Sequence, residues 1–134
     1  MPIGFGFLNL TMERKTLYII RHAKAEEFSF DKEDFYRSLI ERGIKRAEKT
    51  ALILSENLSK SKEKKLLIIS STAKRAAQTA LIFADILEYP TDNIQWIPDI
   101  YDAHYLQLLK SINDVSANYD ELLVFGHNPG LSDL

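Results

Sequence analysis

Four short apolar runs along the chain alternate with stretches in which apolar residues recur every three or four positions. Continuous apolar runs of this length are typical of buried strands, and a spacing of three to four is typical of amphipathic helices. The predicted strands are 16–20, 66–69, 94–97 and 122–125, and the predicted helices cover about 38–58, 74–87 and 106–116, with another beginning at 129. Alternation of strands with helices favours a sheet covered on both faces, so we expect a three-layer α/β/α domain with a mostly parallel sheet.

Polar residues indicate where several of these elements begin. Ser38, followed three residues later by Glu41, fits a capping box for the first helix. Residues 70–72 (SST) offer N-caps for the second helix, and Asn128 before Pro129 fits the N-cap of the last one. Acidic and aromatic residues alternate over 26–36, which predicts an irregular loop there.

The chain of 134 residues is long enough for one domain with an ordinary core. We expect residues 1–12 to be an N-terminal extension and residues 13–134 to form the domain. An extra edge strand or a packing arm is the alternative for residues 1–12. Because the last helix has only begun at Leu134, we expect C-terminal elements to be missing, either because the chain is cut short or because a neighbouring molecule covers the gap.

The composition narrows the class of protein. It is 46% hydrophobic and 27% charged, with a formal net charge of −2, so nothing global points to nucleic acid or to an anionic membrane. No stretch is long and apolar enough to span a bilayer. The sequence has no cysteine, which excludes disulfides, thiolate nucleophiles and cysteine-ligated zinc, and which fits a cytoplasmic protein.

Two histidines stand at the ends of predicted strands. His22 follows the first strand, directly after Arg21, and His127 follows the fourth. Ligands bind where parallel strands end, so both could flank one pocket. A neutral imidazole attacks phosphorus well, and arginine suits the oxygens of a phosphoryl group. The alternative for an isolated Arg-His pair is a capping arginine and a surface histidine.

Arg75 lies in the first turn of the second helix, where a cation opposes the helix dipole unless an anion also binds there. A solvated arginine is the alternative. A metal site is the weaker interpretation, because no His-x-His or His-x-x-x-His spacing occurs. His104 is predicted to be a surface residue. We therefore expect no metal and no other cofactor.

Four motifs together resemble the histidine phosphatase superfamily, which includes the phosphoglycerate mutases. Residues 17–25 (LYIIRHAKA) are similar to its Arg-His-Gly signature, and residues 37–43 (RSLIERG) to its Arg-Pro-Leu-Thr turn. Residues 70–79 (SSTAKRAAQT) are similar to its serine-to-arginine segment. The motif at 126–130 (GHNPG), the short chain and the Ala23 variant resemble its small SixA-type phosphohistidine phosphatase branch. The resemblance covers residues 16–134 and implies a phosphoglycerate mutase-like fold.

The resemblance also implies roles for individual residues. His22 matches the nucleophile that becomes phosphorylated, and Arg21 and Arg75 match the phosphate-binding arginines. His127 matches the second histidine, which contacts the phosphate and stabilises the transition state. Two further residues are expected to bind substrate: Arg37, which matches an arginine that lines the pocket, and Asn128. The family needs no metal.

This sequence departs from the family pattern at the turn, where Ser38 and Ile40 replace the usual proline and threonine. A general acid is the least defined part of the predicted site. Asp99 lies about where larger family members carry the carboxylate that protonates the leaving oxygen, with Asp102 and Glu26 as alternatives. Asp99 could equally be a plain loop carboxylate.

The sequence therefore predicts a metal-independent phosphatase that works through a phosphohistidine intermediate on His22. Phosphohistidine in a protein is the expected substrate, because the short chain leaves no room for a lid over a small metabolite. The alternatives are a broad-specificity phosphomonoesterase, for which Asp99 should matter, and a phosphate-binding interaction module without turnover. The expected partner is thus a phosphorylated protein, not nucleic acid or membrane, and the oligomeric state stays open.

Overall fold

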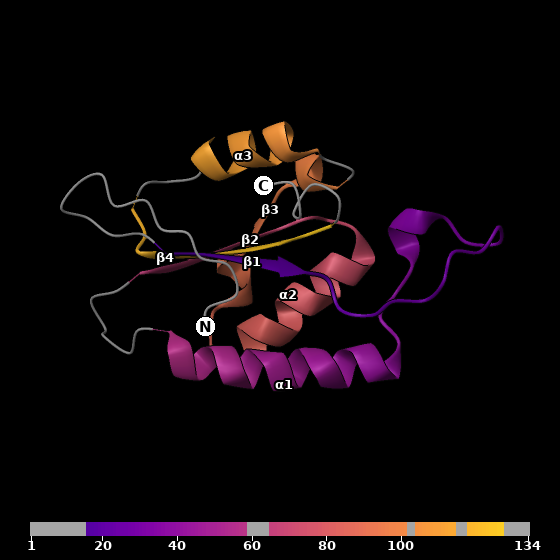
Figure 1. Cartoon of the computed structure of the whole chain (residues 1–134), viewed down its shortest axis with the longest axis horizontal. Helices are drawn as coiled ribbons and strands as arrows, with labels where there is room; N and C mark the ends of the chain where they lie inside the picture. Colours follow the sequence, from indigo (N-terminus) through magenta and orange to yellow (C-terminus); the bar gives the residue numbers. More distant parts are fainter. Residues whose placement is uncertain (1–15, 59–64, 102–103, 115–117, 128–134) are drawn as a thin grey trace.

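The computed structural model describes residues 16–58, 65–101, 104–114 and 118–127 (Figure 1). Several sequence predictions lie outside the described residues: the extension at 1–12, the helix start at Asn128, the expected C-terminal gap, Asp102, and the end of the predicted third helix at 115–116.

Within the described residues, four parallel strands form one sheet in the order β1-β4-β2-β3. They are β1 (Thr16–Arg21), β2 (Leu66–Ser70), β3 (Gln95–Trp96) and β4 (Glu121–Gly126). β4 lies between β1 and β2, and each of its six residues is buried. A parallel strand covered on both faces needs a continuous apolar run, which explains why this segment was recognisable from the sequence.

Helices cover both faces of the sheet, as Figure 1 shows. α1 (Glu41–Asn57) and α2 (Lys74–Ile86) pack on one face, and α3 (Tyr105–Asp114) packs on the other. Side chains alternate along β4: Leu123 and Phe125 join the core under α1 and α2, whereas Leu122 and Val124 join the core under α3. This arrangement confirms the predicted three-layer α/β/α fold with a parallel sheet.

Most predicted elements agree with the structure to within a few residues. The third strand is shorter than predicted, because only Gln95 and Trp96 pair with β2. The predicted loop over 26–36 contains a short 3₁₀ helix at Asp34–Tyr36. None of the helices in the described part of the chain is long and apolar enough to cross a membrane.

The predicted caps of the first two helices are wrong. α1 begins at Glu41 with Ile40 at its N-cap, and Ser38 instead donates its backbone N–H and its hydroxyl to the carboxylate of Glu26. α2 follows Ala73, which has no capping side chain. Both segments lie beside the strand ends, where their polar groups serve other contacts.

Candidate active site

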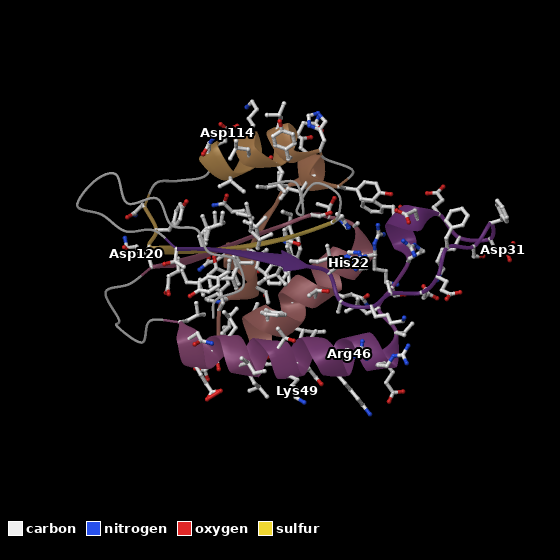
Figure 2. All side chains as sticks on the ribbon, in the orientation of Figure 1. His22, Asp31, Arg46, Lys49, Asp114 and Asp120 are labelled. Atoms are coloured by element: carbon white, nitrogen blue, oxygen red, sulfur yellow. The ribbon has the colours of Figure 1, made fainter. Side chains whose placement is uncertain are left out.

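The register of β1 against β4 brings the two strand-end histidines together. Arg21, the last residue of β1, pairs with Gly126, the last residue of β4. The next residues are His22 and His127, whose ring centroids lie 5.2 Å apart. The backbone N–H of His22 also donates to the Gly126 carbonyl at 3.2 Å. The structure therefore brings together two histidines that are 105 positions apart, and Figure 2 shows His22 where β1 ends.

His22 has the hydrogen-bond pattern of a neutral imidazole. Its Nε2 accepts from Nε of Arg75 at 3.3 Å, and its Nδ1 lies 2.7 Å from the carbonyl oxygen of Ala23. An arginine can only donate, so Nε2 carries a lone pair and Nδ1 carries the proton. Burial lowers the pKa of His22, with further lowering by the charges of Arg75, Arg21 and Arg37, while the Ala23 carbonyl opposes the shift. At neutral pH this ring is therefore a neutral imidazole with a lone pair on Nε2.

The segment that carries His22 is held by both helices on that side of the sheet. The backbone N–H of Ala23 donates to Oγ1 of Thr79 in α2 at 3.0 Å. The carbonyl of Lys24 accepts from the N–H of Ile40, just before α1, at 3.1 Å. A Cβ on Gly43 would overlap that same carbonyl oxygen, so a glycine is needed there for close approach. These contacts fix the backbone on which the imidazole sits.

Arg75 uses its whole guanidinium within the site. Besides His22, it contacts Asp34 twice: Nη1 donates to the backbone carbonyl at 2.7 Å and Nη2 to the carboxylate at 3.0 Å. Its side chain is 7% exposed, so a partner anion is required to compensate for its burial. The guanidinium carbon also lies 5.9 Å from the ring centroid of Tyr101. Arg75 is thus a buried cation at the start of α2, and its partner anion in the structure is the Asp34 carboxylate.

Asp34 is a central residue of the site that the sequence analysis missed. Its carboxylate accepts from Nε of Arg37 at 2.9 Å, from Arg75, and from the hydroxyl of Tyr101 at 2.7 Å. Burial alone would raise its pKa, but the Tyr101 hydrogen bond and the two arginines outweigh burial and lower it. Asp34 is therefore an anion that bridges both arginines. The one signal in the sequence was an acid three residues before Arg37 in a loop, which is too common to be diagnostic.

His127 is buried at the end of β4, where its Nε2 lies 2.8 Å from Oγ of Ser71. That oxygen already accepts from the N–H of Ala73, so its own proton is available to Nε2. The Nδ1 atom is buried and has no hydrogen-bond partner among the described residues. Burial, followed by the charge of Arg75, lowers the pKa of His127 to about 3. His127 is a neutral imidazole with one unused nitrogen.

Arg37 and Glu26 hold the loop against this site. Nη1 of Arg37 donates to the backbone carbonyl of Glu26 at 2.6 Å, and Nη2 forms an ion pair with Asp34 at 2.7 Å. The Glu26 carboxylate accepts from Ser38 and from Nζ of Lys32. These contacts, the Ser38 backbone N–H first, lower the pKa of Glu26 to about 2. Glu26 is therefore ionised at neutral pH and has no proton to donate.

The other predicted acid, Asp99, and the third histidine, His104, are both exposed. Asp99 is exposed in the 3₁₀ helix Pro98–Ile100, and its charge acts on Lys110 of α3. His104 is exposed beside α3, as predicted for a surface residue.

A surface pocket of about 430 Å³ opens over His22 and is lined by residues 21–27 and Arg37. Exposed Arg21 and Lys24 give this pocket a cationic wall. No group of three His, Asp, Glu or Cys side chains within the described ranges could hold a metal ion. The arrangement can bind a tetrahedral anion and present a nucleophilic nitrogen to it.

No family model matches the chain, and no curated protein matches it significantly. Solved structures do match. The provisionally assigned phosphohistidine phosphatase SixA from Agrobacterium tumefaciens is 29% identical, with a TM-score of 0.75, over 87% of this chain and 71% of that one. The protein histidine phosphatase SixA complexed with tungstate is 21% identical, with a TM-score of 0.70, over 88% of this chain and 72% of that one.

A phosphoglycerate mutase from Plasmodium falciparum shares the fold at 19% identity, with a TM-score of 0.56, over 84% of this chain and 60% of that one. The chain thus spans less than two thirds of that mutase. These matches give the fold as phosphoglycerate mutase-like, as the resemblance of the motifs implied.

Proposed function

We propose that this chain is a metal-independent phosphatase that acts on phosphohistidine in proteins. Its structural similarity to the SixA-type branch of the histidine phosphatase superfamily supports this proposal. The observation that carries the proposal is the hydrogen bond from Arg75 to His22 Nε2, with Nδ1 turned to the Ala23 carbonyl. In this arrangement the lone pair of His22 Nε2 points to the Arg75 guanidinium, which could bind the phosphoryl group of the substrate.

The reaction would proceed in two displacements. The substrate phosphohistidine carries a proton from solvent on its other ring nitrogen. The lone pair of His22 Nε2 attacks phosphorus, an Nε2–P bond forms, and the P–N bond of the substrate breaks with its electron pair on the departing neutral imidazole. A water oxygen then attacks the phosphorus of phospho-His22. The Nε2–P bond breaks, Nε2 recovers its lone pair, and the water proton leaves to solvent with inorganic phosphate.

The charged groups around His22 would stabilise the transferring phosphoryl group. Arg75 and Arg37 already hold a carboxylate oxygen of Asp34, so the same N–H groups can turn to phosphoryl oxygens. In the tautomer whose Nε2 accepts from Ser71, Nδ1 of His127 carries the ring proton and would donate to another phosphoryl oxygen. Arg21 adds charge at the pocket wall. Asn128, which lies outside the described residues, is proposed to bind substrate as well.

The protonation of the nearby carboxylates supports a phosphohistidine substrate. Two of the acids at the site, Asp34 and Glu26, have lowered pKa values. Neither can protonate an alkoxide leaving group, which a phosphate monoester needs. Imidazole leaves readily without such an acid. The names of the SixA relatives agree with this class of substrate, and the cysteine-free sequence fits our placement of the activity in the cytoplasm.

Phosphate release from a chemically phosphorylated histidine protein tests the proposal. We expect release that survives a chelator, vanishes in His22→Ala and is unchanged in His104→Ala, the matched histidine outside the site. The acid limb of kcat/KM should lie below pH 6.5, because the pKa of His22 is lowered from that value. Release that persists in His22→Ala would refute the nucleophile assignment.

The leaving-group argument has its own test. Asp99→Asn should leave phosphohistidine turnover unchanged, and aryl phosphate should be a poor substrate of both proteins. Fast aryl phosphate turnover that is lost in Asp99→Asn would instead support a phosphomonoesterase. Tight phosphate binding without any product would support an interaction module.

A further inference from the structure

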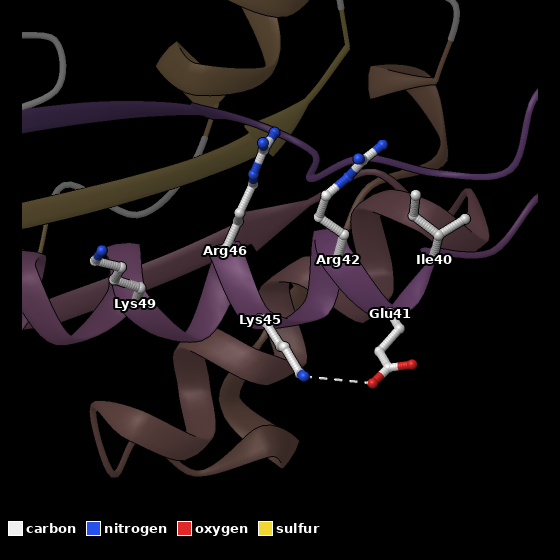
Figure 3. Close-up of a pocket in the computed structure, with 6 residues that line it drawn as sticks. All are labelled: Ile40, Glu41, Arg42, Lys45, Arg46 and Lys49. Carbon is white, nitrogen blue, oxygen red and sulfur yellow. Dashed lines mark ion pairs between the residues drawn. The ribbon is translucent and has the colours of Figure 1, made fainter.

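The exposed side of α1 carries a cationic edge, defined by Arg42, Arg46 and Lys49. These residues are spaced by four and three positions, so they lie on one side of the helix. Figure 3 shows them rising from the same side, whereas Glu41 and Lys45 lie on the other. The cationic edge lines a surface hollow of about 650 Å³ together with Ile40, Glu41 and Lys45. This hollow is larger than the pocket over His22.

The cationic edge lacks internal compensation. Among the residues the structure describes, none of its three side chains forms an ion pair, whereas Lys45 pairs with Glu41 at 3.4 Å. Like charges at these helical spacings destabilise a helix. The whole chain carries a formal net charge of −2, so this cluster is a local concentration of positive charge. An external anion would relieve the repulsion.

The cationic edge continues the wall of the pocket over His22. Lys24 lines that pocket, and its backbone carbonyl accepts from Ile40 at the start of α1. Gly43 packs directly against the same carbonyl. From Arg42 to Lys49 the edge runs about 10 Å along the helix axis. A molecule whose phosphoryl group enters the pocket could therefore lie along α1.

The composition next to the cationic edge fits a protein partner. Leu52 and Ile53, one turn beyond Lys49, are 56% and 53% exposed. Aliphatic contact area beside a charged rim is typical of protein interfaces. A surface for single-stranded nucleic acid would instead be expected to carry aromatic side chains for stacking, and the exposed side of α1 has none.

We propose that the cationic edge docks an acidic surface beside the phosphorylated histidine of the protein substrate. This inference rests on the proposed function and adds what the substrate must look like around its phosphohistidine. Arg42, Arg46 and Lys49 would pair with carboxylates of the partner and raise its local concentration at the pocket. None of the three lines the pocket over His22, so we expect the chemical step not to depend on them.

The test compares three synthetic peptides that each carry one histidine, phosphorylated with phosphoramidate, and differ in flanking residues: glutamate, glutamine or lysine. The full chain should turn over the glutamate peptide with a kcat/KM about tenfold above that of the glutamine peptide, mainly through KM. Salt at about 0.5 M should remove the preference by screening. The triple variant Arg42→Gln, Arg46→Gln, Lys49→Gln should lose the preference for the glutamate peptide. Of two matched single variants, Arg46→Gln should reduce this preference, whereas Lys110→Gln, on α3, should leave it unchanged.

Small N-phosphoimidazole separates docking from chemistry. The triple variant should hydrolyse it at the wild-type rate. If the wild type hydrolyses it but treats the three peptides alike, or prefers lysine flanks, the docking proposal is wrong and the proposed function stands. If the wild type cannot hydrolyse it, the proposed function fails, and anisotropy with the unphosphorylated glutamate peptide decides docking alone. Stronger binding to duplex DNA or to phosphatidylserine vesicles, lost in the triple variant, would overturn the assignment to an acidic protein.

Discussion

Gly43→Ala reverses the usual effect of a glycine-to-alanine change in a helix. Gly43 lies in the first turn of α1, and its backbone conformation is ordinary, so alanine could adopt it. In an open helix the change would stabilise the protein by as much as about 1 kcal/mol, because the unfolded chain loses freedom. Here the added Cβ would overlap the Lys24 carbonyl oxygen and lie 3.0 Å from the Lys24 carbonyl carbon and nitrogen.

The magnitude follows from what has to move. The neighbouring atoms belong to backbone, so the overlap can be relieved only if α1 and the segment after β1 separate. Overpacking of this kind costs about 1–3 kcal/mol, which cancels or exceeds the helix gain of about 1 kcal/mol and leaves a net loss of as much as about 2 kcal/mol. The segment that moves carries His22 two residues away, and a shift on the order of 1 Å costs about a hundredfold in rate. We therefore expect both stability and kcat/KM to fall.

Urea unfolding and phosphate release together provide the assay. The control compares two variants at Glu48, an exposed position in the same helix. Glu48→Ala should be more stable than Glu48→Gly by about 1 kcal/mol. If Gly43→Ala gains stability as that control pair does, and keeps full activity, the close contact with Lys24 does not hold the segment and the reasoning is refuted.

Three further outcomes are expected. Arg75→Lys should reduce kcat/KM by roughly a hundredfold in steady-state assays, since an ammonium cannot contact His22 and Asp34 together; a loss below about threefold would contradict the fork geometry. Asp34→Asn should lower the inhibition constant of inorganic phosphate roughly three- to tenfold, because Arg75 loses a competing anion; an unchanged constant would count against that competition. The folded-state pKa of His127, about 3, lies below the 6.5 of an unfolded imidazole, so the folded protein binds fewer protons over that interval. The free energy of unfolding should therefore fall as the pH drops from about 6.5 towards 3, by on the order of 1 kcal/mol per pH unit, and urea midpoints should fall less steeply in His127→Gln.

The sheet and its two histidines were predictable because they depend on strong, local signals. Buried parallel strands must be continuously apolar, and a histidine that directly follows such a strand lies at the edge where ligands bind. The register of Arg21 against Gly126 then brings His22 and His127 together without any further signal.

The loop-borne half of the site was not predictable in the same way. Asp34 and Tyr101 meet the arginines through tertiary contacts that leave no periodic pattern in the sequence. Ser38 looked like a helix cap, but it binds Glu26, a residue twelve positions away that competes for the same donors. Asp99 was proposed from its place along the chain alone; it is exposed in the structure, and its role as an acid stays a prediction.

The loop between β1 and α1 differs from the rest of the domain in what holds it. From Glu26 to Arg37 none of its residues is buried, and Phe30 is 98% exposed. Its ties to the domain include the hydrogen bonds and ion pairs of Asp34 and Arg37 and the ring contact of Phe35 with Tyr101. Segments with few buried apolar contacts open locally at a small free-energy cost. On heating, this loop would detach while the sheet stayed folded, and Arg37 would leave the site with it. Thermal inactivation should therefore begin below the temperature at which the domain unfolds.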